Sequence, residues 1–349
     1  MASGLILLTG ATGFLGIRVL ALALERGYQV RCAIRKATDL DKLRGAPRIE
    51  RLSLAENQLS SVVVPDMTVS HAYDEAVKGA RYIVHCASPM PNVSSKIGSG
   101  SEEDAFVTPA VLGVMGILAS GAEHAKDTLK RVVITSSIVA ITPPEYFIGK
   151  GDSSKLPVTS EWRIPNLSQP YMPGFGVYQA SKTKSLNTIE EWQSTNATPF
   201  DIITLMPSLI LGVDDLATTP RELEKSGNAI LLSLLKGNQS PIPLNSAVVD
   251  VNDVALAHLR SLDENITGNQ SFILGGPGDW IKTTAIAKSV VPGAFSDGIL
   301  QEGGVQHTFD VAVDARKTEG LLDIKPTPYH NTVAAVAIQY VELCKGAKV

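Results

Sequence analysis

Short apolar segments alternate with longer stretches of helical pattern through the first two hundred or so residues. The apolar segments are typical of buried parallel strands, because nearly continuous Val, Ile and Leu leaves no polar face. They cover residues 4–8, 29–34, 60–65, 81–85, 131–135 and 200–206. Helical patterns run between them, over 17–25, 72–78, 102–125 and 178–194. The alternation predicts an α/β fold of the Rossmann type, a doubly wound parallel sheet.

The turn between the first strand and the first helix carries three glycines, Gly10, Gly13 and Gly16. Glycines at such a turn let backbone amides at the helix N-terminus approach a pyrophosphate closely. The spacing departs from G-x-G-x-x-G, so an ordinary strand-to-helix turn remains the alternative. The residues predicted to bind a dinucleotide here are Thr9, Gly10, Thr12, Gly13, Phe14, Leu15 and Gly16.

The second strand ends in a basic residue, Arg35, 19 residues beyond Gly16. An Asp or Glu at this place usually binds the ribose 2′-hydroxyl of NAD, whereas a guanidinium can bind the 2′-phosphate of NADP. Lys42 could lie on the same rim. We therefore predict NADP(H) as the cofactor, against the alternative that Arg35 is a solvated charge at a strand end.

Two further strand ends are candidate cofactor contacts, since open parallel sheets bind ligands beyond the carboxyl ends of their strands. Asp66 and Met67 follow the third strand, where Asp66 could accept a hydrogen bond from an adenine amino group or could simply cap a turn. Ala87 and Ser88 follow the fourth strand in a run of small residues that suits close backbone passage beside a cofactor.

The chemistry is predicted at Tyr178 and Lys182, which share one helix face because they are four residues apart. A nearby cation should lower the pKa of the phenol from its ordinary value near ~10 toward neutral pH. Ser137, at the end of the fifth strand, can donate a hydrogen bond to a carbonyl oxygen that gains negative charge. Ser136 is an open alternative for this role.

Composition narrows the classes of function. The 349 residues carry a net charge of −4, which gives no electrostatic reason to expect nucleic acid as a partner. No apolar run suggests a membrane span, and the first strand begins too close to Met1 for a signal peptide. The cysteines Cys32, Cys86 and Cys344 are far apart in the sequence, which favours free thiols in a reducing compartment. The histidines form no metal-binding motif. We expect a cytoplasmic monomer or homodimer.

These motifs together resemble the extended short-chain dehydrogenase/reductase family, and within it the dihydroflavonol-reductase-like group of NADPH carbonyl (aldehyde and ketone) reductases. Nearly the whole chain takes part in the resemblance. The matching stretches are Thr9–Gly16, Val30–Arg35, His85–Pro89, Thr108–Val111, Val132–Ser137, Tyr178 with Lys182, Pro207–Gly212, Val249–Ala255 and Asp314–Lys317. One departure is Gly113-Val114-Met115-Gly116, where relatives often carry Gly-Thr-x-Asn.

The resemblance implies roles for single residues. Ser137 and Tyr178 would bind the carbonyl oxygen, and Lys182 would bind the ribose and tune the phenol. Pro207 would lie beside the nicotinamide, with Ile210 also in the cofactor site. We expect Met90, Phe175 and Ser208 to contact the substrate, a small-molecule carbonyl compound.

Two parts are expected, an NADP-binding domain over 1–207 and a mainly substrate-binding lobe over 208–349. Helices are predicted in the lobe over 228–236, 253–262 and 331–344, with a strand over 272–274. The proline-rich loop 143–176 should contribute to the substrate site, because loops of this length are usually functional. Its apolar members favour a bulky hydrophobic carbonyl: Tyr146, Phe147, Trp162, Tyr171, Met172 and Phe175.

Three functional hypotheses follow. The first is an NADPH-dependent carbonyl reductase. The second is a sugar-nucleotide epimerase or dehydratase, although a dehydratase would need a carboxylate beside the serine strand, where Ile138, Val139 and Ala140 stand instead. The third is a regulatory protein that senses NADP without chemistry, which would have no use for Ser137, Tyr178 and Lys182 together.

Overall fold

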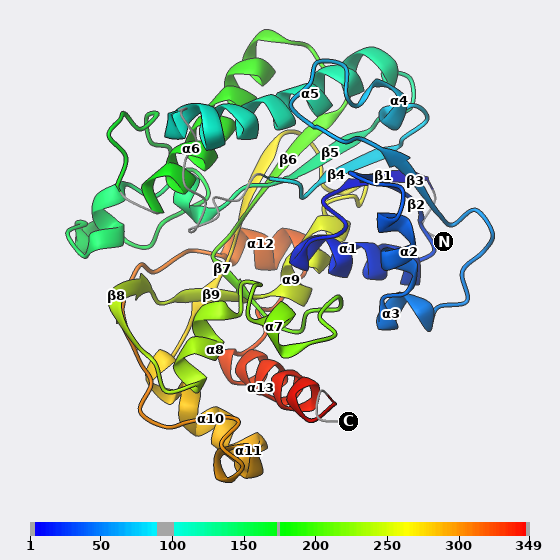
Figure 1. Ribbon diagram of the computed structural model, residues 1–349. Coiled ribbons are helices and arrows are strands. Elements are labelled where there is room, and N and C mark those ends of the chain that lie inside the picture. Colours follow the sequence, from blue (N-terminus) through cyan, green and yellow to red (C-terminus); the bar gives the residue numbers. More distant parts are fainter. Residues whose placement is uncertain (1–3, 89–100, 173–174, 347–349) are drawn as a thin grey trace. The chain divides into compact units, whose positions relative to one another are not determined.

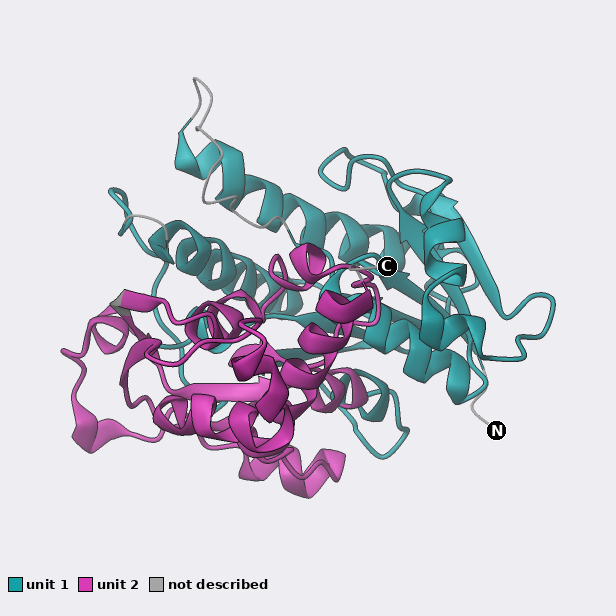
Figure 2. Ribbon diagram, turned by 60° about the horizontal axis from the view of Figure 1, so that its bottom comes forward, with its two compact units in different colours: residues 1–142, 160–206, 257–272 teal, residues 143–159, 207–256, 273–349 magenta. Residues whose placement is uncertain are grey.

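A computed structural model describes residues 4–88, 101–172 and 175–346 and divides the chain into two compact units. Unit 1 comprises Met1–Thr142, Ser160–Met206 and Ala257–Phe272, and unit 2 comprises Pro143–Thr159, Pro207–Leu256 and Ile273–Val349 (Figure 2). The chain therefore returns to unit 1 for residues 257–272, whereas the expected division at residue 207 assigned these residues to the substrate-binding lobe. The predicted loop 143–176 is divided between the two units.

Unit 1 is built on a seven-stranded sheet in the order β10-β6-β5-β4-β1-β2-β3. Its strands are β1 (Leu5–Thr9), β2 (Gln29–Ile34), β3 (Leu59–Val63), β4 (Tyr82–His85), β5 (Arg131–Thr135), β6 (Asp201–Pro207) and β10 (Gln270–Leu274). The pairs from β3 through β6 are parallel. The predicted Rossmann-type fold is thus confirmed, and the strand order reverses between β1 and β4, where such sheets bind their ligands.

Helices cover both faces of this sheet (Figure 1). They are α1 (Phe14–Glu25), α2 (Asp39–Arg44), α3 (Pro47–Glu50), α4 (Asp74–Val77), the π-helix η1 (Glu103–Val107), α5 (Thr108–His124), the 3-10 turn η2 (Ile138–Ala140) and α6 (Phe175–Thr195). Helices α5 and α6 lie side by side on one face (Figure 1). Fully buried Leu7, Ile83, Ile117 and Val132 form part of the core between the strands and α5.

The helical stretch Glu103–His124 bears on the expectation that no apolar run suggests a membrane span. It is 22 residues long, and an 18-residue window within it has a mean hydropathy of 1.8, enough by length and composition to cross a membrane. In the structure 44% of that apolar window is buried inside the protein. Core helices of soluble proteins meet the same criteria, so this helix is weak evidence for a span.

Unit 2 contains a three-stranded sheet in the order β11-β9-β7 and a two-stranded sheet of β12 and β8. The strands are β7 (Leu209–Leu211), β8 (Gln239–Asn245), β9 (Ala247–Asp250), β11 (Gly276–Pro277) and β12 (Val305–Phe309). The helices are η3 (Pro144–Ile148), η4 (Ser153–Lys155), α7 (Pro220–Leu223), α8 (Ala229–Leu235), α9 (Val251–Arg260, which passes into unit 1 at Ala257), η5 (Trp280–Lys282), α10 (Thr283–Val290), α11 (Pro292–Ser296), α12 (Arg316–Leu322) and α13 (Tyr329–Gly346). Buried Leu232, Leu235, Val336 and Tyr340 form part of its core.

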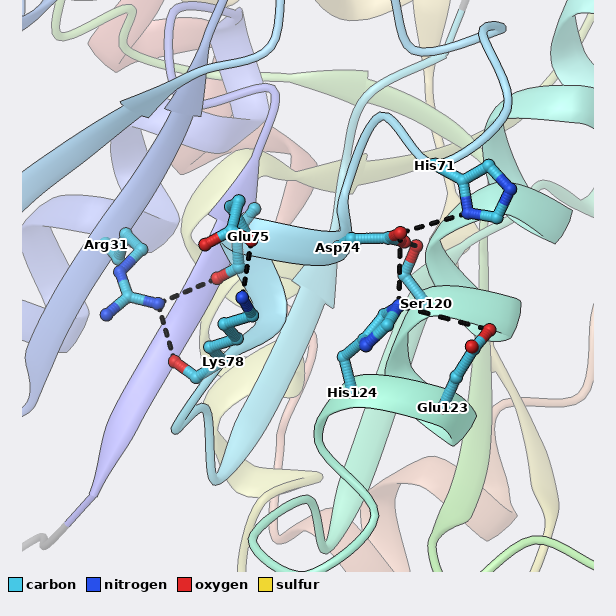
Figure 3. A network of polar contacts seen from close by, with 9 residues as sticks. Arg31, His71, Asp74, Glu75, Lys78, Ser120, Glu123 and His124 are labelled. Carbon is cyan, nitrogen blue, oxygen red and sulfur yellow. Dashed lines mark hydrogen bonds and ion pairs between the residues drawn. The ribbon is translucent and has the colours of Figure 1, made fainter.

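Asp74, the first residue of α4, connects α4 to α5 (Figure 3). Its carboxylate accepts a hydrogen bond of 2.6 Å from Ser120 Oγ and lies 3.0 Å from His71 Nδ1 and 3.1 Å from His124 Nε2. The Ser120 hydrogen bond, followed by the two histidines, holds the pKa of Asp74 below its ordinary value. A carboxyl with a lowered pKa stabilises the fold above its unfolded pKa, and this stabilisation is lost as the pH falls through the folded pKa.

The Asp74→Asn variant should therefore be less stable than the wild type at pH 7, by about 1 kcal/mol for a partly exposed charged hydrogen bond. The difference should shrink as the pH approaches the pKa of the wild-type carboxyl. Urea unfolding at pH 7 and at about pH 3, below the unfolded pKa of an aspartate, measures both quantities. Asp127→Asn, an exposed aspartate close by in sequence, is the control and should change neither value. A pH-independent loss for Asp74→Asn would contradict this assignment.

Candidate active site

The glycine turn after β1 is packed too tightly for side chains at two positions. Gly10 has φ +74°, and a Cβ on it would lie 2.7 Å from the backbone nitrogen of Ala87. A Cβ on Gly16 would lie 2.0 Å from the Gly10 carbonyl oxygen. Gly13 caps α1 without a side-chain hydrogen bond, so no side chain at that cap occupies the amides of the first turn. This cradle fits a pyrophosphate, which helix N-terminal amides bind.

The carboxyl ends of β1 and β4 are joined directly beside this turn. Thr9 pairs with His85 in the sheet, Thr9 Oγ1 lies 2.9 Å from His85 Nδ1, and the Ala87 amide donates to Thr9 Oγ1 at 3.2 Å. Since Thr9 Oγ1 already accepts from Ala87, its own proton is best donated to His85 Nδ1. Burial, together with the charge of Lys182, lowers the pKa of His85 to about 3 and keeps the ring neutral. The backbone of Ala87, a predicted cofactor contact, is thereby held beside Gly10.

Arg35 and Asp66, two of the residues predicted for the cofactor, follow the carboxyl ends of the neighbouring strands β2 and β3. Arg35 follows β2 and Lys42 lies in α2; both are exposed. Asp66 is exposed after β3 and already accepts hydrogen bonds of 2.8 Å and 2.7 Å from the amide and hydroxyl of Thr68, which lower its pKa. Asp66 thus caps a turn, as the alternative to an adenine contact predicts.

Met67 occupies the space next to the departure from the family pattern on α5. A Cβ on Gly113 would lie 2.9 Å from Met67 Cε. The small residue at 113 therefore admits the Met67 side chain against the helix. Ser88 is half-buried after β4.

Ser137, Tyr178 and Lys182 are brought together in unit 1. Ser137 lies between β5 and η2, where its Oγ accepts a 3.4 Å hydrogen bond from the Val139 amide. Its side chain also hydrogen-bonds Tyr178, the contact that favours Ser137 over Ser136. Lys182 Nζ lies 5.9 Å from the centre of the Tyr178 ring and donates to the Thr135 carbonyl at 3.4 Å.

The pKa values in this group differ from the expectation. Burial raises the pKa of Tyr178, and the hydrogen bond with Ser137 opposes the rise. The predicted lowering by Lys182 is wrong for the protein alone, because the phenolate is penalised by desolvation. Burial also lowers the pKa of Lys182 to about 8. The phenol is therefore protonated at neutral pH, as a proton donor must be.

Several residues that support this group were not predicted for it. Gln179, almost fully buried, donates from Nε2 to the carbonyls of Val139 and Thr142, at 3.2 Å and 2.8 Å, and so fixes α6 against η2. Buried His258 lies with Nε2 2.8 Å from Thr135 Oγ1. Gln179 could have been suspected as a polar residue on the same helix as Tyr178, whereas nothing in the sequence ties residue 258 to residue 135.

The remaining predicted residues do not all belong to one unit. The Phe175 ring lies 6.3 Å from the Tyr178 ring. Pro207, Ser208 and Ile210 belong to unit 2, where the amide and the hydroxyl of Ser208 both donate to the Leu274 carbonyl, at 2.8 Å and 3.2 Å. Met90 lies outside the described residues.

Comparison with known proteins defines the class. Residues 6–275 match the model of the NAD dependent epimerase/dehydratase family, and the chain belongs to that family. This confirms the predicted resemblance, since the extended short-chain dehydrogenases/reductases include it.

Three relatives illustrate the match. Ketoreductase CTB6 of Cercospora nicotianae is 36% identical over 351 residues, 98% of this chain and 96% of that one. NAD-dependent epimerase/dehydratase ALT6 of Alternaria alternata is 34% identical over 273 residues, 75% of this chain and 73% of that one. The solved structure of Gre2 from Candida albicans in complex with NADPH has a TM-score of 0.79 and 22% identity, over 98% of this chain and 99% of that one, and shows the same fold.

The glycine turn gives a direct test of this cradle. Gly16→Ala must displace the Gly10 carbonyl, a strain of about 1–3 kcal/mol, and should weaken NADPH binding roughly tenfold or more. Gly320→Ala in α12 is the control, because a Cβ there meets nothing within 4 Å. Fluorescence titration with NADPH and thermal unfolding compare the two variants. Wild-type NADPH affinity in Gly16→Ala would contradict the geometry.

Proposed function

We propose that the protein reduces a ketone or aldehyde to an alcohol with NADPH. The observation that carries this proposal is the grouping of Ser137, Tyr178 and Lys182 in unit 1. The hydroxyl of Tyr178 is hydrogen-bonded to the serine, and the lysine is almost fully buried, 8% exposed. The ketoreductase name of the CTB6 relative supports the same reaction.

The chain's residues fit a nicotinamide dinucleotide. Gly10, Gly13 and Gly16 would hold the pyrophosphate, Arg35 and Lys42 the 2′-phosphate, and Lys182 the ribose. The NADPH bound to the related Gre2 fold supports this choice of cofactor. When bound, NADPH supplies the hydride.

The side chains then manage the charge and the proton. The Ser137 hydroxyl donates a hydrogen bond to the carbonyl oxygen, which gains negative charge as the carbonyl is reduced. The Tyr178 phenol, kept protonated by burial, donates its proton to that oxygen. The Lys182 ammonium, close to the Tyr178 ring, then stabilises the phenolate that is left.

The epimerase or dehydratase alternative is less well supported, although the ALT6 relative carries that name. The residues that follow Ser137 are Ile138, Val139 and Ala140, all buried and apolar in η2. They provide no carboxylate to remove water. A sensor without chemistry would not need a protonated phenol beside a buried ammonium.

We further propose a bulky, hydrophobic substrate. Phe175 lies against Tyr178, and Met172, three residues earlier, is 38% exposed. Tyr146 does not serve this purpose, since it is buried in unit 2 with its hydroxyl donating to the Asp152 carbonyl at 2.8 Å. Apolar walls with few polar groups suit aryl ketones better than nucleotide sugars.

A substrate panel tests the class of reaction. NADPH oxidation followed at 340 nm should be fast with aryl ketones. UDP-glucose and other nucleotide sugars should be recovered unchanged when they are analysed by chromatography, since their epimerisation would not consume NADPH. Product analysis by chiral chromatography should show the alcohol. Turnover of nucleotide sugars without any reduction of ketones would overturn the proposal in favour of the alternative.

Arg35 should set the preference for NADPH over NADH. Losing a charge-assisted contact of ~1.5–3 kcal/mol, Arg35→Ser should weaken NADPH binding roughly tenfold to hundredfold and leave NADH binding nearly unchanged. Arg44→Ser, an exposed arginine of α2, is the matched control. Equal affinity of the wild type for the two cofactors would refute the role of Arg35.

The proton donor and its ammonium neighbour can be separated by pH. Tyr178→Phe should reduce turnover about 100- to 10,000-fold while NADPH still binds. Because the pKa of Lys182 is lowered to about 8, its ammonium is present below that pH and is lost as the pH rises through it. Wild-type turnover should therefore fall above about pH 8, and Lys182→Ala should lack this decline. A Tyr178→Phe enzyme with near-normal turnover would remove Tyr178 from the mechanism.

A further inference from the structure

A carboxylate outside the catalytic group joins three segments of unit 1. Glu103 begins the π-helix η1, and its Oε1 accepts a hydrogen bond of 2.6 Å from Lys184 Nζ of α6. Its Oε2 accepts a short hydrogen bond from the Tyr171 hydroxyl, in the loop that leads into α6. Burial raises the pKa of Glu103, but the hydrogen bonds from Lys184 and Tyr171 outweigh it and leave that pKa lowered. Burial first, and then the hydrogen bond to Glu103, raise the pKa of Tyr171 to about 12, so the carboxylate is ionised and the phenol protonated.

The π-helix that presents Glu103 has an identifiable cause. Pro109 lacks the N–H that would bond the Ala105 carbonyl in a regular α-helix, and its ring would clash with that carbonyl. The chain widens instead, and the Thr108 amide donates to the Glu103 carbonyl, five residues back. Such single π-turns change the direction of the residues that precede them.

The loop segment that Glu103 holds is packed directly on the start of the catalytic helix. The Gly176 amide donates to the Met172 carbonyl at 2.8 Å. A Cβ on Gly176 would lie 2.9 Å from Met172 Cβ and 3.3 Å from the Tyr171 carbonyl carbon. Tyr171 also packs against an apolar cluster that includes Val107 of η1 with Val177 and Ala180 of α6.

These contacts connect Glu103 with Tyr178 through the segment Tyr171–Met172 and the start of α6. Glu103 bonds Tyr171, the Tyr171–Met172 backbone packs on Gly176, and the neighbouring Phe175 places its ring against Tyr178. We propose that Glu103 is a positioning residue for substrate, which fixes Tyr171 and the first turn of α6 so that Phe175 and Met172 form a stable apolar wall beside Tyr178. This inference rests on the proposed carbonyl reduction and adds a determinant of how its substrate fits.

The cofactor residues should be insensitive to this arrangement. Glu103 contacts Tyr171 and Lys184, and neither of these belongs to the glycine turn or to the ends of β2 and β3. A loss of Glu103 should consequently raise the KM for a bulky ketone and spare both kcat and the Kd of NADPH.

The variants are Glu103→Ala, Glu103→Gln and Tyr171→Phe, with Glu102→Gln as the matched control. We expect Glu103→Ala and Tyr171→Phe to raise the KM for an aryl ketone about tenfold, with the Kd of NADPH within twofold of wild type. Glu103→Gln keeps an acceptor for the Tyr171 hydroxyl and should recover most of the loss. Glu102→Gln removes the neighbouring carboxylate and should behave as wild type.

Hydrogen exchange provides a readout that does not depend on turnover. The Gly176 amide should exchange about tenfold faster in Glu103→Ala and Tyr171→Phe than in the wild type, and should be unchanged in Glu102→Gln. If no ketone is reduced by the wild type, the proposed function fails while this exchange still tests the positioning role. An unchanged Gly176 exchange rate, or a loss of NADPH affinity as large as the rise in KM, would overturn the inference.

Discussion

The carboxyl ends of β1 and β4 approach so closely that no Cβ atom fits between them at Gly10. A Cβ there would lie 2.7 Å from the Ala87 nitrogen, and one on Gly16 would lie 2.0 Å from the Gly10 oxygen. The strand order reverses at this point: β2 and β3 follow on one side of β1, whereas β4, β5 and β6 follow on the other. The tie between Thr9, His85 and the Ala87 amide holds that edge in place without adding charge. Lys182 of the candidate site lies near this junction, since its charge helps to lower the pKa of His85.

The second constraint is the buried positive charge of Lys182, which lies beside neutral titratable groups. Lys182 is 8% exposed, and two titratable neighbours carry no charge at neutral pH. Burial lowers the pKa of His85 to about 3 and raises that of the Cys86 thiol to about 12. The field of the ammonium is therefore not cancelled by these two, and in a weakly polar surrounding it acts more strongly than it would in water. The same desolvation keeps Tyr178 protonated, which suits reduction.

The sequence predicts those parts of the structure that depend on neighbouring residues. Strands β2 and β5 begin and end as predicted, because Gln29–Ile34 and Arg131–Thr135 are short apolar runs with clear flanking signals. The grouping of Tyr178 with Lys182 follows from helical spacing. Strands β8 and β12 are not predictable in this way, because they pair only with each other across a long separation and β8 contains two prolines.

Other features depend on burial, which spacing alone does not reveal. The sequence predicts a lowered pKa for Tyr178, and this prediction is wrong because the cost of desolvation exceeds any effect of Lys182. The contact of Glu103 with Tyr171 joins residues 68 positions apart, and Glu103 begins a π-helix that local pattern does not predict. The return of Ala257–Phe272 to unit 1, which brings His258 to Thr135, has no signal in local pattern either.

The proposed reaction is the hydride reduction of a carbonyl, in which the protein supplies the proton. The most direct measurement is a reaction with NADPH that carries deuterium at both C4 positions of its dihydronicotinamide ring, followed by mass spectrometry and NMR of the alcohol. Hydride transfer from NADPH should place one deuterium on the carbinol carbon of every alcohol molecule formed, and none should appear at that carbon when the deuterium is supplied as D₂O instead. Alcohol that carries solvent deuterium on the carbinol carbon, or consumption of substrate without any alcohol, would contradict it.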